Sequence, residues 1–163
     1  MRTKLLGLSG RRREPQFELA RKFGVVDYPS PAGGCKLTEE GFGRRLKDLL
    51  DHEGLRDRRL VDLLVIARRF RLPDGTGVIL GRDVRENAAL KAAGDVGELV
   101  YTVNCPGPTA LVPGKPGREA LERVSALVAA WAKYDRLQEP VCTNICTVQP
   151  PYDRAEFLPH QIL

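Results

Sequence analysis

Apolar residues recur at helical spacing near the start of the chain and predict a first helix there. Within residues 13–24, Phe17, Ala20 and Phe23 form an apolar stripe. Gly24 is suited to end this helix, because glycine readily adopts the left-handed conformation of a helix C-terminus.

A second helix is expected after Thr38, whose side chain can cap the helix N-terminus. Glu39 and Glu40 then fall in its first turn, where the positive end of the helix dipole favours carboxylates. One apolar face of this helix is formed by Phe42, Leu46, Leu49 and Leu50.

The pattern becomes ambiguous over residues 58–72 and then changes to that of β-structure. The start of this stretch fits a helical turn, whereas residues 65–81 fit a β-hairpin. Asp74-Gly75 lies between the two β-rich runs and is a favoured pair for a tight turn.

The remainder of the chain alternates between helix and strand signals. Asp83 and Glu86 have the spacing of a capping box at the start of a helix that Gly94 can end. The other elements expected are strands over 98–103, 109–112 and 141–148, a helix over 117–136 and an extended tail from residue 150.

These elements predict an α+β fold, a small mixed β-sheet with packed helices that follows a helical basic N-terminal arm. Residues 1–59 are assigned to the arm and a junction with a Pro-Gly-Cys loop, residues 60–149 to the α+β domain and residues 150–163 to the tail. The length of 163 residues suits one domain with such an extension.

Positive charge is concentrated at the start of the sequence. The net charge is +5, and residues 1–24 hold seven Arg or Lys against two Glu, so the rest of the chain is neutral. A basic arm on a neutral body is the pattern of local contact with a phosphate backbone. The alternative is a solvated terminus that only keeps the protein in solution.

The sequence does not suggest a membrane protein or a secreted one. No apolar run approaches the roughly 18 residues that span a bilayer, and the apolar block near the start is too short for a signal peptide. A soluble, cytoplasmic protein is therefore expected.

Motifs of ATP-dependent and hydrolytic enzymes are missing from the sequence. There is no Walker loop, no G-x-G-x-x-G after a strand and no G-x-S-x-G elbow. Metal binding is not favoured either, since Cys142 and Cys146 form a single C-x3-C pair and both histidines are distant. We interpret this pair as core cysteines of the expected strand and Cys105 as a turn residue.

Cys35 is the residue with the clearest chemical signal. It follows a Gly-Gly pair and precedes an expected helix N-terminus, whose dipole favours the thiolate, as does the neighbouring Lys36. This setting suits a sulfur nucleophile or persulfide carrier. The alternative is a buried cysteine that acts as a small hydrophobic residue.

Arginine-rich stretches supply candidates for RNA contact, because the guanidinium fork binds phosphate with two hydrogen bonds. Arg82 stands out, since it lies between a strand end and a helix cap, where main-chain N–H groups also favour an anion. For each candidate a solvated surface is the alternative, and Tyr101 and Phe70 can stack on bases only if they are exposed. The candidates are Arg11, Arg12, Arg13, Arg44, Arg45, Arg68, Arg69, Arg71, Arg82, Arg85 and Lys115.

Two stretches, "VILGRDVRENAAL" and "GELVYTVNCPGPTALV", together resemble the NFACT RNA-binding domain of ribosome quality-control proteins. Gly81, Arg82 and Asn87 match that family's strand-to-helix motif, and Pro106-Gly107 matches its turn. Asp83 replaces the family's Asn, and the two residues after the turn, Pro and Thr, replace its Ser-His. The resemblance implies an RNA-binding role for Asn87 as well as for Arg82.

The stretch that begins "SGRRREPQFELARKFG" and runs through "YPSPAGGCKLT" resembles the junction of PP-loop tRNA thiouridylase-like proteins. The resemblance implies tRNA as partner, Cys35 as a candidate sulfur relay and a cysteine desulfurase or other sulfur donor. The PP-loop domain itself does not occur in the sequence. No cofactor is therefore expected in this chain, and ATP and Mg would belong to a partner PP-loop protein.

Three functions remain open from the sequence. The first is an RNA-binding, specifically tRNA-binding, accessory domain or subunit of a tRNA thiolation system. The second is a sulfurtransferase component that carries a persulfide on Cys35, and the third is a structural docking domain for the PP-loop partner.

Overall fold

The computed structural model describes residues 14–27, 35–133 and 139–163. The chain forms two compact units, Met1–Gly34 and Cys35–Leu163. The first unit contains helix α1 (Glu14–Lys22), which confirms the helix predicted over residues 13–24.

The second unit is built around a five-stranded sheet of order β3-β4-β2-β1-β7. All of its strand pairs are antiparallel, and β1 and β2 form the predicted hairpin around Gly75. With the helices packed on the sheet, the fold is α+β, as predicted. The strands are β1 (Arg68–Arg71), β2 (Gly77–Leu80), β3 (Gly97–Tyr101), β4 (Thr109–Pro113) and β7 (Gln161–Ile162).

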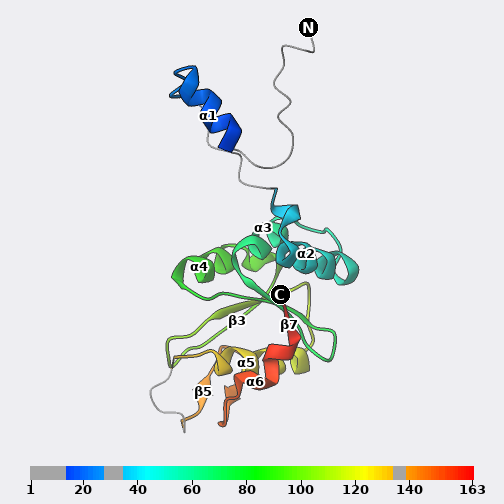
Figure 1. The fold of residues 1–163 in the computed structure, drawn as a ribbon. Helices are drawn as coiled ribbons and strands as arrows, with labels where there is room; N and C mark the ends of the chain where they lie inside the picture. The colour runs from blue at the N-terminus through cyan, green and yellow to red at the C-terminus, as the bar shows by residue number, and fades with distance from the viewer. Residues whose placement is uncertain (1–13, 28–34, 134–138) are drawn as a thin grey trace. The chain divides into compact units, whose positions relative to one another are not determined.

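Helices cover both faces of the sheet (Figure 1). Side chains alternate between the faces along each strand, so Ile79 packs with the helices on one face and Val78 and Leu80 pack with those on the other. The first layer holds α2 (Glu40–His52), α3 (Arg58–Ile66) and α4 (Val84–Ala92), and the second holds α5 (Arg118–Ala130) and α6 (Arg154–Phe157).

A buried ion-pair cluster joins β1 to α2. Arg69 is fully buried, and its Nε donates to Asp48 at 2.9 Å while Nη2 donates to Glu53. Arg71, two residues along the same strand face, donates to both carboxylates as well. Arg69 and Arg71 are therefore committed to the fold, which corrects the prediction that they contact RNA. Gly77 is needed beside them, because a Cβ there would lie 2.3 Å from Glu53 Oε1.

Residues 141–148 do not form the single strand that was predicted. They form a hairpin of β5 (Val141–Cys142) and β6 (Thr147–Val148). The turn between these strands bonds to the outer edge of β3, since Asn144 Oδ1 accepts from Tyr101 N at 2.9 Å and its Nδ2 donates to Leu99 O at 2.8 Å. The asparagine amide thus supplies strand-like bonds to an edge strand that would otherwise be open.

The tail from residue 150 was predicted to be extended, and this prediction is wrong. It contains α6, a 3₁₀ turn (Leu158–His160) and strand β7, which pairs with β1. Phe157 lies in the core against α5 and contacts Trp131 edge to face. The tail therefore completes the sheet and one of its helical layers.

Residues 35–59 were predicted to belong with the arm. In the structure they are part of the same compact unit as the sheet. The reason is that Phe42 and Leu49 of α2 are buried in the core with α3 and α4. Thr38 does not cap α2 as predicted, because its hydroxyl donates to Cys35 O at 2.7 Å and the cap position is held by Glu39.

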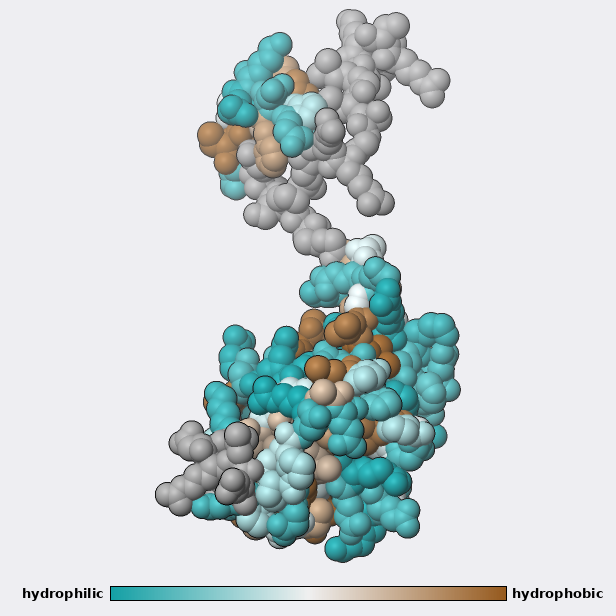
Figure 2. Space-filling model, turned by 60° about the horizontal axis from the view of Figure 1, so that its bottom comes forward, coloured by the Kyte–Doolittle hydropathy of each residue, from teal (hydrophilic) through white to brown (hydrophobic). Residues whose placement is uncertain are grey.

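One face of the molecule is largely hydrophilic (Figure 2). Hydrophilic residues cover most of the face seen in Figure 2, with smaller hydrophobic areas between them. None of the described helices combines the length and the apolar character that crossing a membrane would require.

Candidate nucleic-acid interface

The candidate site lies at one end of the sheet, where several strands begin or end. Leu80 is the last residue of β2 and pairs with Arg68, the first residue of β1. Gly81, which follows, donates its N–H to Thr109 O at the start of β4 at 3.0 Å. The antiparallel order of the strands therefore brings the sequence motifs around residues 81–87 and 106–109 together.

Asn87 holds these two motifs in place. Its Oδ1 accepts from Thr109 N at 2.9 Å, and its Nδ2 donates to Gly107 O at 3.4 Å. Gly81 leaves room for this amide, because a Cβ at that position would lie 2.3 Å from Asn87 Oδ1. The residues that match the family motif thus build the shape of the loops, and Asn87 does so through both atoms of its amide.

The N-terminus of α4 orients Arg82. Asp83 caps the helix by accepting from Glu86 N at 2.9 Å, which confirms the predicted cap. The buried carboxylate of Glu86 accepts from Arg82 N at 2.7 Å and from Arg82 Nε at 2.9 Å, and this hydrogen bonding raises the pKa of Arg82 above its ordinary value. The Arg82 side chain still remains 56% exposed. The guanidinium is therefore fixed in direction and open to solvent.

A small hollow, which we call the Trp131 pocket, opens beside these loops with a volume of about 170 Å³. Lys133 reaches it because α5 ends at Ala130 and Lys133 N then donates to Pro106 O at 2.8 Å. The pocket is lined by residues 81–84, Asn87 and residues 106–108, and by Arg68, Trp131 and Lys133.

Arg68 is held in this pocket in an unusual electrostatic setting. Its guanidinium carbon lies 5.5 Å from the centroid of the Trp131 ring, and its buried Nε has no hydrogen-bond partner among the described residues. Burial, and then the positive charges of Arg82 and Arg154, lower the pKa of Arg68. Arg154 lies 5.7 Å from the same ring and is anchored by the bond from its Nε to Ala130 O.

The positive surface continues past Arg82 into a second hollow of about 450 Å³. Val65, Ile66 and Arg85 line this hollow and are exposed. Arg45 lies close enough for the charge of Arg82, after burial, to lower its pKa. We call the surface formed by Arg45, Arg68, Arg82, Arg85, Lys133 and Arg154 the basic face.

The other predicted RNA contacts lie elsewhere. Arg44 is on the exposed surface of α2, where it pairs with Glu40. Lys115 follows Pro113 at the opposite end of β4, roughly 13 Å along the strand at 3.3 Å per residue. Arg11, Arg12 and Arg13 lie outside the described residues.

Cys35 is exposed and is the first residue of the sheet-containing unit. The helical segment that follows it is a three-residue 3₁₀ turn, and α2 begins only at Glu40. The dipole of α2 therefore does not act directly at the Cys35 thiol, contrary to the prediction from the sequence. Among the residues that the structure describes, no group of three or more His, Cys, Asp or Glu is arranged to hold a metal ion.

The two aromatic residues considered for base stacking differ in their exposure. Phe70 is fully buried and belongs to the core, whereas Tyr101 is 37% exposed with Lys91 Nζ 5.5 Å from its ring. Trp131 and Lys133 were not among the residues predicted for the site. Their position depends on where α5 meets the turn at Pro106, a long-range contact with no local sequence signal.

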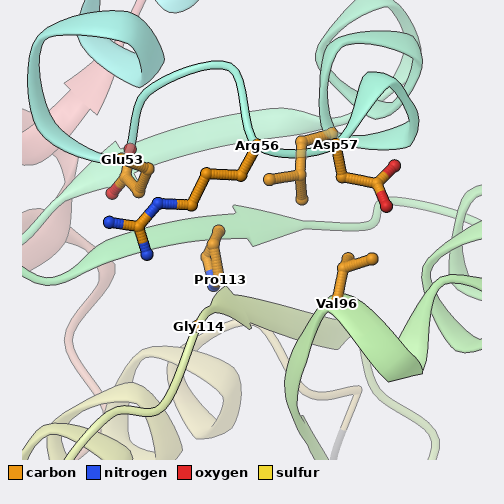
Figure 3. Close-up of a pocket in the computed structure, with 7 residues that line it drawn as sticks. Glu53, Arg56, Asp57, Val96, Pro113 and Gly114 are labelled. Carbon is orange, nitrogen blue, oxygen red and sulfur yellow. The ribbon is translucent and has the colours of Figure 1, made fainter.

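A further hollow of about 230 Å³ lies at the opposite end of the sheet (Figure 3). In Figure 3, Arg56 extends its guanidinium toward Glu53, and Asp57 is on the other side of Arg56 above Val96. Asp57 is engaged in capping α3 through Arg59 N at 2.8 Å. Two carboxylates beside one guanidinium make this hollow less suited to an anion than the Trp131 pocket.

No curated protein and no solved structure matches the chain. A protein-family model described as "NFACT protein RNA binding domain" matches residues 67–151, which is just over half of the chain and includes β1 to β6. The chain therefore belongs to the NFACT RNA-binding domain family.

Proposed function

We propose that the chain binds tRNA through its basic face, as an accessory domain or subunit of a tRNA thiolation system. The observation that carries the RNA contact is a group of cations without carboxylate partners. Within the described part of the chain, Arg82 pairs with Glu86, whereas no ion pair is formed by the other cations of the basic face, Arg45, Arg68, Arg85, Lys133 and Arg154. Phosphate groups of a nucleic acid would supply the missing negative charge.

The thiolation setting is supported by the resemblance of the first part of the chain to the junction of PP-loop tRNA thiouridylase-like proteins. In such a system the present chain holds tRNA, while a PP-loop partner protein binds ATP and Mg²⁺ and activates the base. The alternation of charged and apolar side chains on the basic face fits this role, since Arg82 and Arg85 lie beside the exposed Val65 and Ile66. Arginine binds phosphate, and apolar side chains can contact ribose and base edges.

Binding to a labelled tRNA transcript is expected to weaken steeply with salt. If Arg68, Arg82, Arg85 and Lys133 each contact a phosphate, affinity should fall roughly 50- to 150-fold between 50 and 200 mM salt, because each contact releases condensed counterions. Fluorescence anisotropy over a salt series measures this slope. An affinity that stays flat over this range would contradict the proposal. A PP-loop partner that retains tRNA alone would then favour a docking role.

A second candidate function is sulfur transfer through Cys35, and the exposure of the thiol is the observation that favours it. In this step the Cys35 thiolate attacks the terminal sulfur of a persulfide on a cysteine desulfurase. A sulfur–sulfur bond forms at Cys35, the one in the desulfurase breaks, and the desulfurase cysteine leaves as a thiolate.

Incubation with a cysteine desulfurase and cysteine is expected to add one sulfur atom to Cys35, as measured by mass spectrometry of the intact protein and its peptides. The Cys35→Ser variant should lose this added mass, whereas Cys146→Ser should keep it. Full thiolation activity of Cys35→Ser with its partner would remove this candidate.

A further inference from the structure

The Trp131 pocket has an excess of positive charge that the folded chain does not neutralise. Of its cations, Arg82 is paired with Glu86, but Arg68 and Lys133 have no carboxylate partner in the described part of the protein. Asp83, the acidic residue among those that line the pocket, is occupied as the cap of α4. An anion that enters the pocket would therefore meet two uncompensated cations.

Arg68 supplies an independent sign that a ligand group is missing. Its Nε is buried without a hydrogen-bond partner within the described residues, and a buried donor left unpaired is costly. The ring of Trp131 on one side and the nearby charges of Arg82 and Arg154 restrict where its guanidinium can lie. An anion in the pocket would reduce the repulsion between these cations.

The size of the pocket limits what that acceptor can belong to. Its volume of about 170 Å³ is below the roughly 300–1,000 Å³ of sites for small organic ligands. It is larger than the roughly 30 Å³ that one water occupies. A single phosphate group with a few waters fits these limits, and a whole nucleotide does not.

We propose that the Trp131 pocket binds one backbone phosphate of the RNA, held by Arg68, Arg82 and Lys133. The inference rests on the proposed RNA-binding function and adds a specific subsite to it. The N-terminus of α4 contributes, because Val84 lines the pocket and the positive end of the helix dipole is located there. The larger hollow, which shares Arg82 and Asp83, is the place for the adjoining nucleotide.

The pocket contains its own spectroscopic probe, since Trp131 is the only tryptophan in the chain. Titration with inorganic phosphate is expected to shift the indole N–H signal of Trp131 in the NMR spectrum of the full chain. Lys133→Gln should weaken this response, and Lys115→Gln, which removes the same charge at the other end of β4, should leave it unchanged. Lys133 is exposed, and its side chain has no hydrogen-bond or ion-pair partner among the residues that the structure describes, so its variant is expected to fold normally.

Binding to the labelled tRNA transcript provides the second measurement. Lys133→Gln should lower affinity about three- to tenfold and reduce the salt slope by about one, whereas Lys115→Gln should do so much less. RNA with a 5′-hydroxyl should bind as well as RNA with a 5′-phosphate. A loss confined to the 5′-hydroxyl RNA would overturn the assignment to a backbone phosphate.

The two measurements separate this inference from the function on which it rests. If tRNA binds with a steep salt slope while phosphate leaves Trp131 unchanged and the two lysine variants behave alike, the pocket assignment fails and RNA binding stands. If phosphate shifts Trp131 but tRNA does not bind, the proposed function fails and the assignment to an RNA phosphate fails with it.

Discussion

Asp48→Ala is expected to lower the free energy of unfolding by about 3–5 kcal/mol, the usual cost of removing one partner from a buried ion pair. Arg69 is fully buried, and Asp48 is 9% exposed and shared between Arg69 and Arg71. Without this carboxylate, Glu53 alone faces two arginines. Chemical denaturation followed by circular dichroism measures the change.

Asp51→Ala is a matched control, because Asp51 lies on the same helix but is half exposed and, among the described residues, pairs with Lys47 alone. Its loss should cost less than about 1 kcal/mol, as for other surface ion pairs. Equal losses in the two variants would show that the buried cluster contributes nothing beyond a surface pair. Asp48→Asn, which keeps the shape of the side chain, offers a milder test if the alanine variant does not fold.

The same carboxylate gives the stability a pH dependence with a defined sign. Burial alone would raise the pKa of Asp48, but hydrogen bonds from Arg71 and Arg69 lower it below its ordinary value. A carboxyl whose pKa is lower in the folded protein stabilises the fold above its unfolded pKa of about 3.9. This contribution is lost as the pH falls below that value, so Asp48→Asn should flatten the acid limb of the stability curve.

The double variant Arg85→Gln/Lys133→Gln is expected to weaken tRNA binding by about 10- to 100-fold. Each of these exposed cations loses one phosphate contact, and the logarithmic salt slope should fall by about two. Neither side chain has a hydrogen-bond or ion-pair partner among the described residues, so the fold should be unaffected. Anisotropy at two salt concentrations, together with a thermal unfolding curve, measures both effects.

The control for this double variant is Lys115→Gln/Arg118→Gln, which removes the same net charge from the far end of the sheet. It should reduce affinity only through the overall charge, and the reduction should be several-fold smaller. Equal effects of the two double variants would mean that RNA is attracted by net charge and does not contact the basic face.

Local signals predicted the helix cap beside the site and the turn at the opposite end of the β1–β2 hairpin. The cap at Asp83 and the tight turn at Gly75 depend on a few neighbouring residues, and both were confirmed by the structure. The arrangement of Gly81, Arg82 and Asn87 around one strand-to-helix turn also follows from their spacing. What the sequence did not reveal is that Asn87 reaches across to Thr109, because that bond joins two segments far apart in the chain.

The arginines of β1 show why long-range contacts could not be predicted from the sequence. Alternation along a strand separates Arg68 from Arg69 and Arg71, but it does not say which face is covered by acidic side chains. That depends on Asp48 and Glu53, which approach β1 only after α2 packs on the sheet. The hairpin at residues 141–148 and strand β7 escaped prediction for the same reason, since each depends on pairing with a distant strand edge.

The ion pairs between β1 and α2 also determine how much of the chain is needed for a stable folding unit. The family match begins at residue 67, yet the carboxylates that neutralise Arg69 belong to a helix that ends before it. A piece of the chain cut at residue 67 would keep the loops of the proposed RNA contact, but it would leave two arginines uncompensated and would remove α2 and α3 from one face of the sheet, where α4 would remain. We therefore expect the shortest autonomous unit to begin upstream of Asp48, well before the stretch by which the family is recognised.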